Sequence, residues 1–345
     1  MSEDVVMDTL PPWLAAQCSQ LINNPAHALL LHGPSGLGQY ELALSIAQSW
    51  LCEASDHAER LASGQGACGV CASCQQIRAR SHTDLVVLMP ETLMLSLGWP
   101  LPEKAQKEID DKKRKPSKDI RIDDVRSAVA FAELTSGRGR GKAILVFPAE
   151  NLNTASANAL LKTLEEPQGS LRFVLATEAA HQLLPTIRSR CQAFPLAAPS
   201  PQQALDWMAA QAGNAKAQDL EVALHASGGR PLDALQLLAQ DVPALWPKLP
   251  LAMQKGQVQA VAQLSGTQLL DVLHKLCHDL WASKLGVAPR FYQQQDLPKA
   301  PPARALAAWG QQLKSLSRQI EHPFKQELLL EDMVNQAKVC INSRV

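Results

Sequence analysis

The stretch that decides the fold is Gly33–Tyr40, which reads GPSGLGQY. It follows a short apolar run, Ala28–Leu31, and precedes a helical pattern, Glu41–Leu51. A strand, a glycine-rich turn and a helix in this order are the setting of a phosphate-binding P-loop, in which backbone N–H groups and a helix N-terminus hold an anion. The sequence therefore predicts a P-loop-type α/β unit around this turn.

The last two positions of this loop depart from the P-loop pattern. The pattern ends in Gly-Lys-Ser/Thr, whereas here Gly38 is followed by Gln39 and Tyr40. The lysine that reaches the β- and γ-phosphates is absent, and so is the short hydroxyl side chain that holds Mg²⁺. Because Gly33 and Gly36 remain, the loop keeps the backbone of a nucleotide site without its charged groups, and we expect no functional ATP site.

A P-loop ATPase also needs an acidic residue or pair at the end of a neighbouring strand, to hold Mg²⁺. The candidate strand, Ala143–Phe147, continues into Pro148, and Glu150 alone follows two residues late. Two separate positions have therefore lost their charged groups. The residues favour a chain that keeps the loop for folding and does not hydrolyse ATP, while residual nucleotide binding without turnover stays open.

Composition limits the class of protein. The 345 residues suffice for two or three domains, and 46% of them are hydrophobic. Lys+Arg and Asp+Glu both number 33, so the surface as a whole is not a basic face for nucleic acid. Met1–Gln17 does not resemble a signal peptide, and no apolar run approaches the ~18 residues of a membrane span. We expect a cytoplasmic protein without a membrane partner, whose cysteines are reduced or metal-bound.

Four cysteines have the spacing of a metal site. Cys68, Cys71 and Cys74 form a C-x2-C-x2-C run, and Cys52 stands upstream at the end of the helix after the P-loop. Four thiolates suit tetrahedral Zn²⁺ and leave no position for water, so the module over residues 52–74 is expected to be structural. The chemical alternative is an iron–sulfur cluster, whose pattern adds a cysteine followed by proline that this stretch lacks.

Short apolar strands alternate with helices through the first part of the chain. Beyond the P-loop unit, the pattern predicts a strand at Asp84–Met89, a helix at Asp123–Leu134, a strand at Lys142–Phe147, a helix at Thr154–Glu166 and a strand at Leu171–Thr177. This alternation favours an α/β fold with a parallel sheet and helices on both faces. Residues 90–118 carry prolines and a charge run, and we expect an exposed, partly disordered insertion there.

The pattern becomes helical almost throughout after Pro195–Pro201. Breaks at Gly228–Pro231 and Pro243–Pro250 divide this part. We therefore predict three domains: an α/β domain over residues 1–196, a small helical domain over 197–242 and a helical C-terminal domain over 243–345.

Two further runs carry a resemblance to a known family. Asn158–Pro167 reads NALLKTLEEP, and Leu184–Cys191 reads LPTIRSRC. Together they resemble the clamp-loader branch of the AAA+ superfamily, and the cysteine module after the P-loop helix is similar to that of bacterial DNA polymerase III clamp-loader subunits. The resemblance implies an AAA+ domain, a helical lid domain and a C-terminal collar domain. The altered P-loop resembles the branch of this family that does not hydrolyse ATP.

The resemblance also implies a role for Ser189, Arg190 and Cys191. In this family the arginine of the Ser-Arg-Cys motif points across a subunit boundary into the ATP site of a neighbour, as an arginine finger supplied in trans. The simpler interpretation of Arg190, taken without its motif, is a pair with a surface carboxylate. By the same resemblance, the chain is a scaffold that is not an enzyme on its own but is part of the DNA polymerase III holoenzyme, a DNA-directed DNA polymerase (nucleotidyltransferase).

The implied partners are the gamma/tau motor subunits and the delta subunit in a hetero-pentamer, which places the sliding β-clamp on primed DNA during DNA replication. Two other functions stay open. An ATP-hydrolysing motor subunit would need a lysine in place of Gln39 and an acidic pair after the strand. A zinc-finger module that binds nucleic acid would need basic side chains around the cysteines, whereas Glu53, Asp56 and Glu59 stand against one arginine there.

Overall fold

The computed structural model describes residues 10–318 and 326–344, and its contacts divide the chain into two units, Met1–Pro199 and Ser200–Val345. The first nine residues of the predicted α/β domain lie outside the described residues. Among the described residues, no helix combines the length and the apolar character that crossing a lipid bilayer requires.

The first unit is built on a parallel sheet of five strands in the order β2-β3-β4-β1-β5. The strands are β1 (Ala28–His32), β2 (Leu85–Leu88), β3 (Lys142–Val146), β4 (Leu171–Thr177) and β5 (Gln192–Pro195). The sequence predicted the first four, so the α/β class with a parallel sheet is confirmed. The fifth strand was missed because β5 lies at an edge of the sheet and is mostly exposed, so it has no apolar run.

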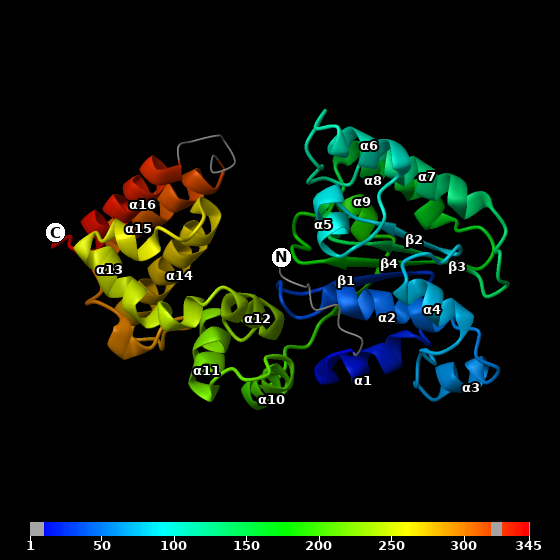
Figure 1. The fold of residues 1–345 in the computed structure, drawn as a ribbon, viewed down its shortest axis with the longest axis horizontal. Coiled ribbons are helices and arrows are strands. Elements are labelled where there is room, and N and C mark those ends of the chain that lie inside the picture. The colour runs from blue at the N-terminus through cyan, green and yellow to red at the C-terminus, as the bar shows by residue number, and fades with distance from the viewer. Residues whose placement is uncertain (1–9, 319–325, 345) are drawn as a thin grey trace. The chain divides into compact units, whose positions relative to one another are not determined.

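Helices cover both faces of this sheet (Figure 1), as the alternating pattern predicted. Helix α2 packs on one face, and α7 and α8 share a buried cluster with the strands on the other. The helical elements are α1 (Pro12–Leu21), α2 (Gln39–Leu51), α3 (His57–Ala62), α4 (Ala72–Arg78), α5 (Glu91–Ser96), α6 (Glu103–Asp110), α7 (Ile122–Glu133), η1 (Ala149–Asn151), α8 (Thr154–Glu165) and α9 (Pro185–Arg188).

The strand order places the glycine-rich loop at the usual ligand position of such a sheet. Strand β1 lies between β4 and β5, and β5 forms one edge of the sheet. The next strand along the chain, β2, forms the other edge. The chain therefore reverses its direction of travel across the sheet beside β1, and ligands of open α/β sheets bind at the carboxyl ends of strands at such a point. The loop 33–38 begins where β1 ends.

Residues 90–118 are folded, which corrects the expectation of a partly disordered insertion. The side chain of Glu91 is 3% exposed and pairs with Arg114 and Arg121. Its Oε1 accepts a 2.7 Å hydrogen bond from Arg114 Nη2, and this pairing lowers the pKa of Glu91 to about 2. The charge run is ordered because part of it pairs around one buried carboxylate instead of facing water. Trp99 of the same segment is also buried.

All the regular elements among the described residues of the second unit are helices, with a core of side chains from α13, α14, α15 and α16 onto which α11 and α12 also pack. Its elements are α10 (Pro201–Gln211), α11 (Ala217–Ala226), α12 (Pro231–Ala239), η2 (Val242–Ala244), η3 (Trp246–Lys248), α13 (Leu249–Lys255), η4 (Val258–Val261), α14 (Gly266–Lys284), η5 (Gln294–Asp296), α15 (Ala303–Ser317) and α16 (Gln326–Ile341). The predicted division of this region near residue 242 stays a prediction.

Candidate functional site

The backbone of the glycine-rich loop has the form that phosphate binding requires. Gly36 and Gly38 adopt φ values of 74° and 99°, in the left-handed region that favours glycine. Gly38 is the residue before α2, whose N-terminus opens onto the loop. A Cβ at Gly33 would lie 3.3 Å from Cβ of Leu196, so this glycine allows a close approach between two segments. The frame of the predicted loop is therefore present.

Gln39 occupies the place of the P-loop lysine and turns back onto the loop itself. Its side chain is 2% exposed, and its amide donates hydrogen bonds of 2.9 Å to the carbonyl of Gly33 and 2.6 Å to that of Pro34. The side-chain N–H groups of Gln39 are therefore bonded to the loop, whereas a lysine at this position would offer its N–H groups to a phosphate. Gln39 therefore stabilises the loop and leaves no cation at this position.

Tyr40 occupies the place of the Mg²⁺-binding hydroxyl and contacts two other aromatic side chains. Its hydroxyl accepts a 2.7 Å hydrogen bond from Nε1 of Trp99, and its ring centroid lies 5.7 Å from that of Phe147. Each of the three residues is only 8% exposed. Burial raises the pKa of Tyr40, so its hydroxyl stays neutral and is a poor ligand for a cation.

The contact between Tyr40 and Phe147 joins the start of α2, directly after the glycine-rich loop, to the residue that follows β3. Phe147 directly follows β3, where an ATPase carries acidic residues. The remaining carboxylate, Glu150, accepts a 2.9 Å hydrogen bond from the backbone of Glu178 with its Oε1. We refer to Tyr40, Trp99 and Phe147 as the aromatic cluster. All three side chains of this cluster are aromatic and buried.

The four predicted cysteines come together. The Sγ atoms of Cys52, Cys68, Cys71 and Cys74 all lie within 4.8 Å of one another, so they are positioned to bind a metal ion. Backbone N–H groups of Cys68 and Cys71 lie 3.3 Å from the sulfurs of Cys52 and Cys68 respectively, and such donors favour thiolates. Gly69 follows Cys68 with a φ of 76°, which lets the chain turn around the sulfurs. Four sulfur ligands suit a closed tetrahedral zinc site.

The cysteine module is fastened to the sheet by charged groups. Glu53, next to Cys52, forms a two-pronged pair with Arg138 at 2.6 and 2.8 Å. Asp84 at the start of β2 accepts from the backbone N–H groups of Gly137 and Arg138, and although burial opposes it, this hydrogen bonding leaves its pKa lowered. Glu53, the acidic residue next to Cys52, is therefore paired within the chain.

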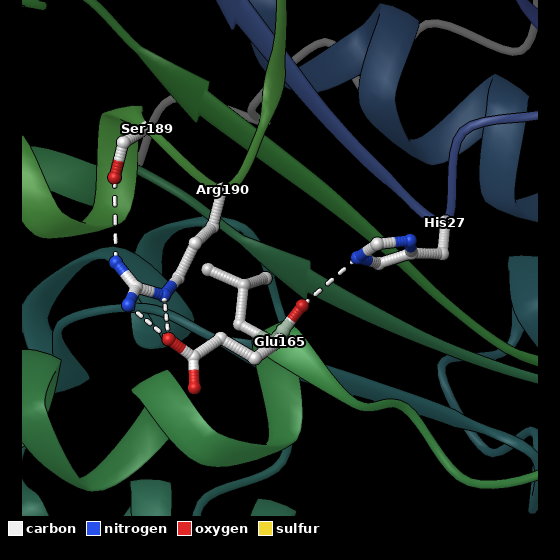
Figure 2. A pocket seen from close by; sticks show the side chains of 5 residues that line it. His27, Glu165, Ser189 and Arg190 are labelled. Carbon is white, nitrogen blue, oxygen red and sulfur yellow. Dashed lines mark hydrogen bonds and ion pairs between the residues drawn. The ribbon is translucent and has the colours of Figure 1, made fainter.

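Arg190 lies at the surface between α9 and β5, and Figure 2 shows its guanidinium turned toward Glu165 at the end of α8. The two groups form an ion pair, with side chains 30% and 44% exposed. Arg190 Nη1 also donates to the carbonyl of Thr186 at 2.9 Å and to the hydroxyl of Ser189 at 3.3 Å. The surface carboxylate of the simpler interpretation is therefore present, and the trans role stays a prediction.

A pocket of about 390 Å³ adjoins this pair and is lined by His27, Leu164, Glu165, Ser189 and Arg190. Ser189 is exposed. Cys191, the last residue of the motif, is half-buried, and burial raises the pKa of its thiol to about 12, so it acts as a small apolar side chain.

Sequence reasoning missed the roles of two residues. Trp99 lies 59 positions from Tyr40, inside the segment that was expected to be exposed and partly disordered. Only the presence of a large aromatic residue beside a charged stretch could have indicated its role. Glu165 belongs to the quoted run 158–167, but nothing in that run indicates which cation it faces.

Together the fold and the site define an α/β protein with a parallel sheet, a glycine-rich loop between β1 and α2, and four cysteines that are positioned to bind a metal ion. A family described as DNA polymerase III, delta subunit, matches residues 15–200. The chain belongs to this family.

Relatives agree with this assignment. The DNA polymerase III subunit delta' of Pseudomonas aeruginosa is 39% identical over 68% of this chain. The matched part covers 63% of that relative's length. The subunit delta' of Escherichia coli is 31% identical over 76% of both chains. The DNA polymerase III subunit tau of Salmonella typhimurium is 30% identical over 70% of this chain and 32% of its own.

Proposed function

We propose that this chain is a delta-prime-type subunit of a bacterial DNA polymerase III clamp loader, with an AAA+ fold and no ATP hydrolysis of its own. The aromatic cluster carries the proposal. Tyr40 and Phe147 stand at the two positions where an ATPase holds Mg²⁺, and their rings contact each other. Gln39 stands in place of the lysine and binds the loop. A motor subunit, the first alternative, has no support from these side chains.

Arg190 would act as an arginine finger for a neighbouring ATP site. The side chain lies at the surface, its charge is permanent, and its exposed ion pair is of the kind that costs little to exchange. A guanidinium stabilises the charge that develops on the transferred γ-phosphoryl group, and such a finger can contribute ~10³–10⁵ in rate at the site it serves. The neighbour would be a gamma/tau motor subunit.

The assembly would be a hetero-pentamer with gamma/tau and delta subunits that loads the sliding β-clamp onto primed DNA in the cytoplasm. Residues 1–196 would form the AAA+ domain that docks on the neighbour. Residues 197–242 would form a lid domain, and residues 243–345 would join the collar of the ring. A nucleic-acid-binding zinc finger, the second alternative, is not favoured, because Glu53 beside the cysteines pairs with Arg138 within the chain.

We expect the metal of residues 52–74 to be zinc in a structural role, because four sulfurs leave no open position for water. Elemental analysis of freshly purified protein should give about one zinc per chain. A clearly lower content, or iron in its place, would contradict the assignment.

The decisive experiment uses the isolated chain and the complex reconstituted with motor subunits. A fluorescent ATP analogue should show no saturable binding to the isolated chain. Arg190→Ala should leave the chain folded and able to join the complex, yet lower the DNA-stimulated ATPase by removing the contribution of the adjacent site. Arg188→Ala, at an exposed arginine two residues earlier, is the matched control. An unchanged ATPase in the Arg190→Ala complex would refute the finger.

A further inference from the structure

The guanidinium of Arg190 is almost fully engaged within its own chain. Nε donates to Oε1 of Glu165, and Nη2 forms an ion pair with the same oxygen. Nη1 donates both to the carbonyl of Thr186 and to the hydroxyl of Ser189. A guanidinium has five N–H donors, and a phosphate is bound best by two parallel ones. The edge formed by Nε and Nη2, which offers two parallel donors, is the one that Glu165 covers.

The favourable electrostatic interaction of Glu165 is with Arg190 and not with the dipole of its own helix. Glu165 is the last residue of α8, where the partial negative charge of a helix C-terminus disfavours a carboxylate. The ring of His27 contacts the carbonyl of Leu164 at 2.9 Å and so fixes the backbone directly before Glu165. Figure 2 shows the hydrogen bond of His27 beside the pair of Glu165 and Arg190. The carboxylate is therefore held in front of the guanidinium by the fold.

We propose that Glu165 is a positioning residue that masks Arg190 in the free subunit and yields the Nε–Nη2 edge when the phosphate of a neighbouring nucleotide arrives. This inference rests on the proposed function. The pair holds the side chain in one rotamer and keeps the guanidinium from other anions before assembly. Because both partners are partly exposed, the mask is weak, and a phosphate displaces it without a large barrier.

The first test needs only the isolated chain and is independent of any neighbour. Phenylglyoxal modifies accessible arginine side chains, and mass spectrometry of peptides gives the rate at each one. Glu165→Gln should raise the modification rate of Arg190 about 1.5- to 5-fold, the range that an exposed ion pair supports, and leave Arg188 unchanged. Glu166→Gln, at the next exposed carboxylate, is the matched control and should have no effect. An unchanged rate at Arg190 overturns the mask.

The second test uses the reconstituted complex at low concentrations of this subunit. Glu165→Gln should raise the DNA-stimulated ATPase about 1.5- to 5-fold, because the arginine no longer has to leave a carboxylate. In an Arg190→Ala background the same change should leave the ATPase unchanged, since Glu165 then has no guanidinium to cover. A fall in ATPase with Glu165→Gln, or an equal effect in both backgrounds, would overturn the proposal.

The two tests separate the failure of this inference from the failure of the proposed function. If Arg190→Ala leaves the ATPase unchanged, the finger is refuted, while faster modification of Arg190 in Glu165→Gln would still report the mask. If Arg190→Ala lowers the ATPase but Glu165→Gln changes neither readout, the finger stands and the mask is refuted.

Discussion

The glycine-rich loop and the Arg190 loop treat charge in opposite ways. In the first, Gln39, Tyr40 and Phe147 are neutral and buried, and the rings of Tyr40 and Phe147 contact each other. In the second, a permanent positive charge is kept at the surface beside a carboxylate. A buried charge without a ligand is costly, whereas an exposed pair is nearly neutral in free energy. The glycine-rich loop therefore has neutral side chains where they are buried, and Arg190 has its charge where the side chain is partly exposed.

The comparison makes a first prediction about stability, with the largest effect. Trp99→Ala should lower the free energy of unfolding by about 3–5 kcal/mol, because it leaves a cavity and removes the hydrogen bond to Tyr40. Arg190→Ala, which touches only an exposed pair, should cost about 1 kcal/mol or less. Urea unfolding of the two variants beside the parent chain measures both. Equal losses would mean that the aromatic cluster is not a packed part of the core.

The second prediction concerns Glu91 and its pairs with Arg114 and Arg121, which lie in and beside the segment that contains Trp99. Glu91→Gln should cost about 1.5–3 kcal/mol at neutral pH, because hydrogen bonds to a charged group are lost from a buried position. The pairing with Arg114 lowers the pKa of Glu91 from its ordinary 4.5 to about 2 in the folded chain. The ionised carboxylate therefore stabilises the fold above pH 4.5, and this contribution is lost as the pH falls toward 2.

The difference between the parent chain and Glu91→Gln should accordingly shrink on going from pH 6 to pH 3 in urea unfolding. Asp123→Asn is a suitable control, since Asp123 pairs with Arg126 at 3.4 Å with both side chains more than two-thirds exposed. That variant should change the stability by less than 1 kcal/mol at either pH. A difference for Glu91→Gln that stays constant with pH would show that the buried pair does not hold the segment.

Local pattern was enough to predict most of the sheet. Strands β1 to β4 are apolar runs that alternate with helices. A strand of a parallel sheet is covered on both faces, so its sequence is a nearly continuous run of apolar residues. The cysteine spacing likewise predicted a ligand set that the fold brings together. The edge strand β5 was missed because it is mostly exposed.

What the sequence alone determined is which chemical groups this protein has: a loop without its lysine, a strand end without its acids, four cysteines and one Ser-Arg-Cys motif. What only the tertiary structure decided is which groups meet. Trp99 reaches Tyr40 across 59 positions, Glu91 reaches Arg114 across 23, and Glu165 reaches Arg190 across 25. The reason is physical. Local propensity fixes an element within a few turns, but contacts between distant elements depend on the packing of the whole domain.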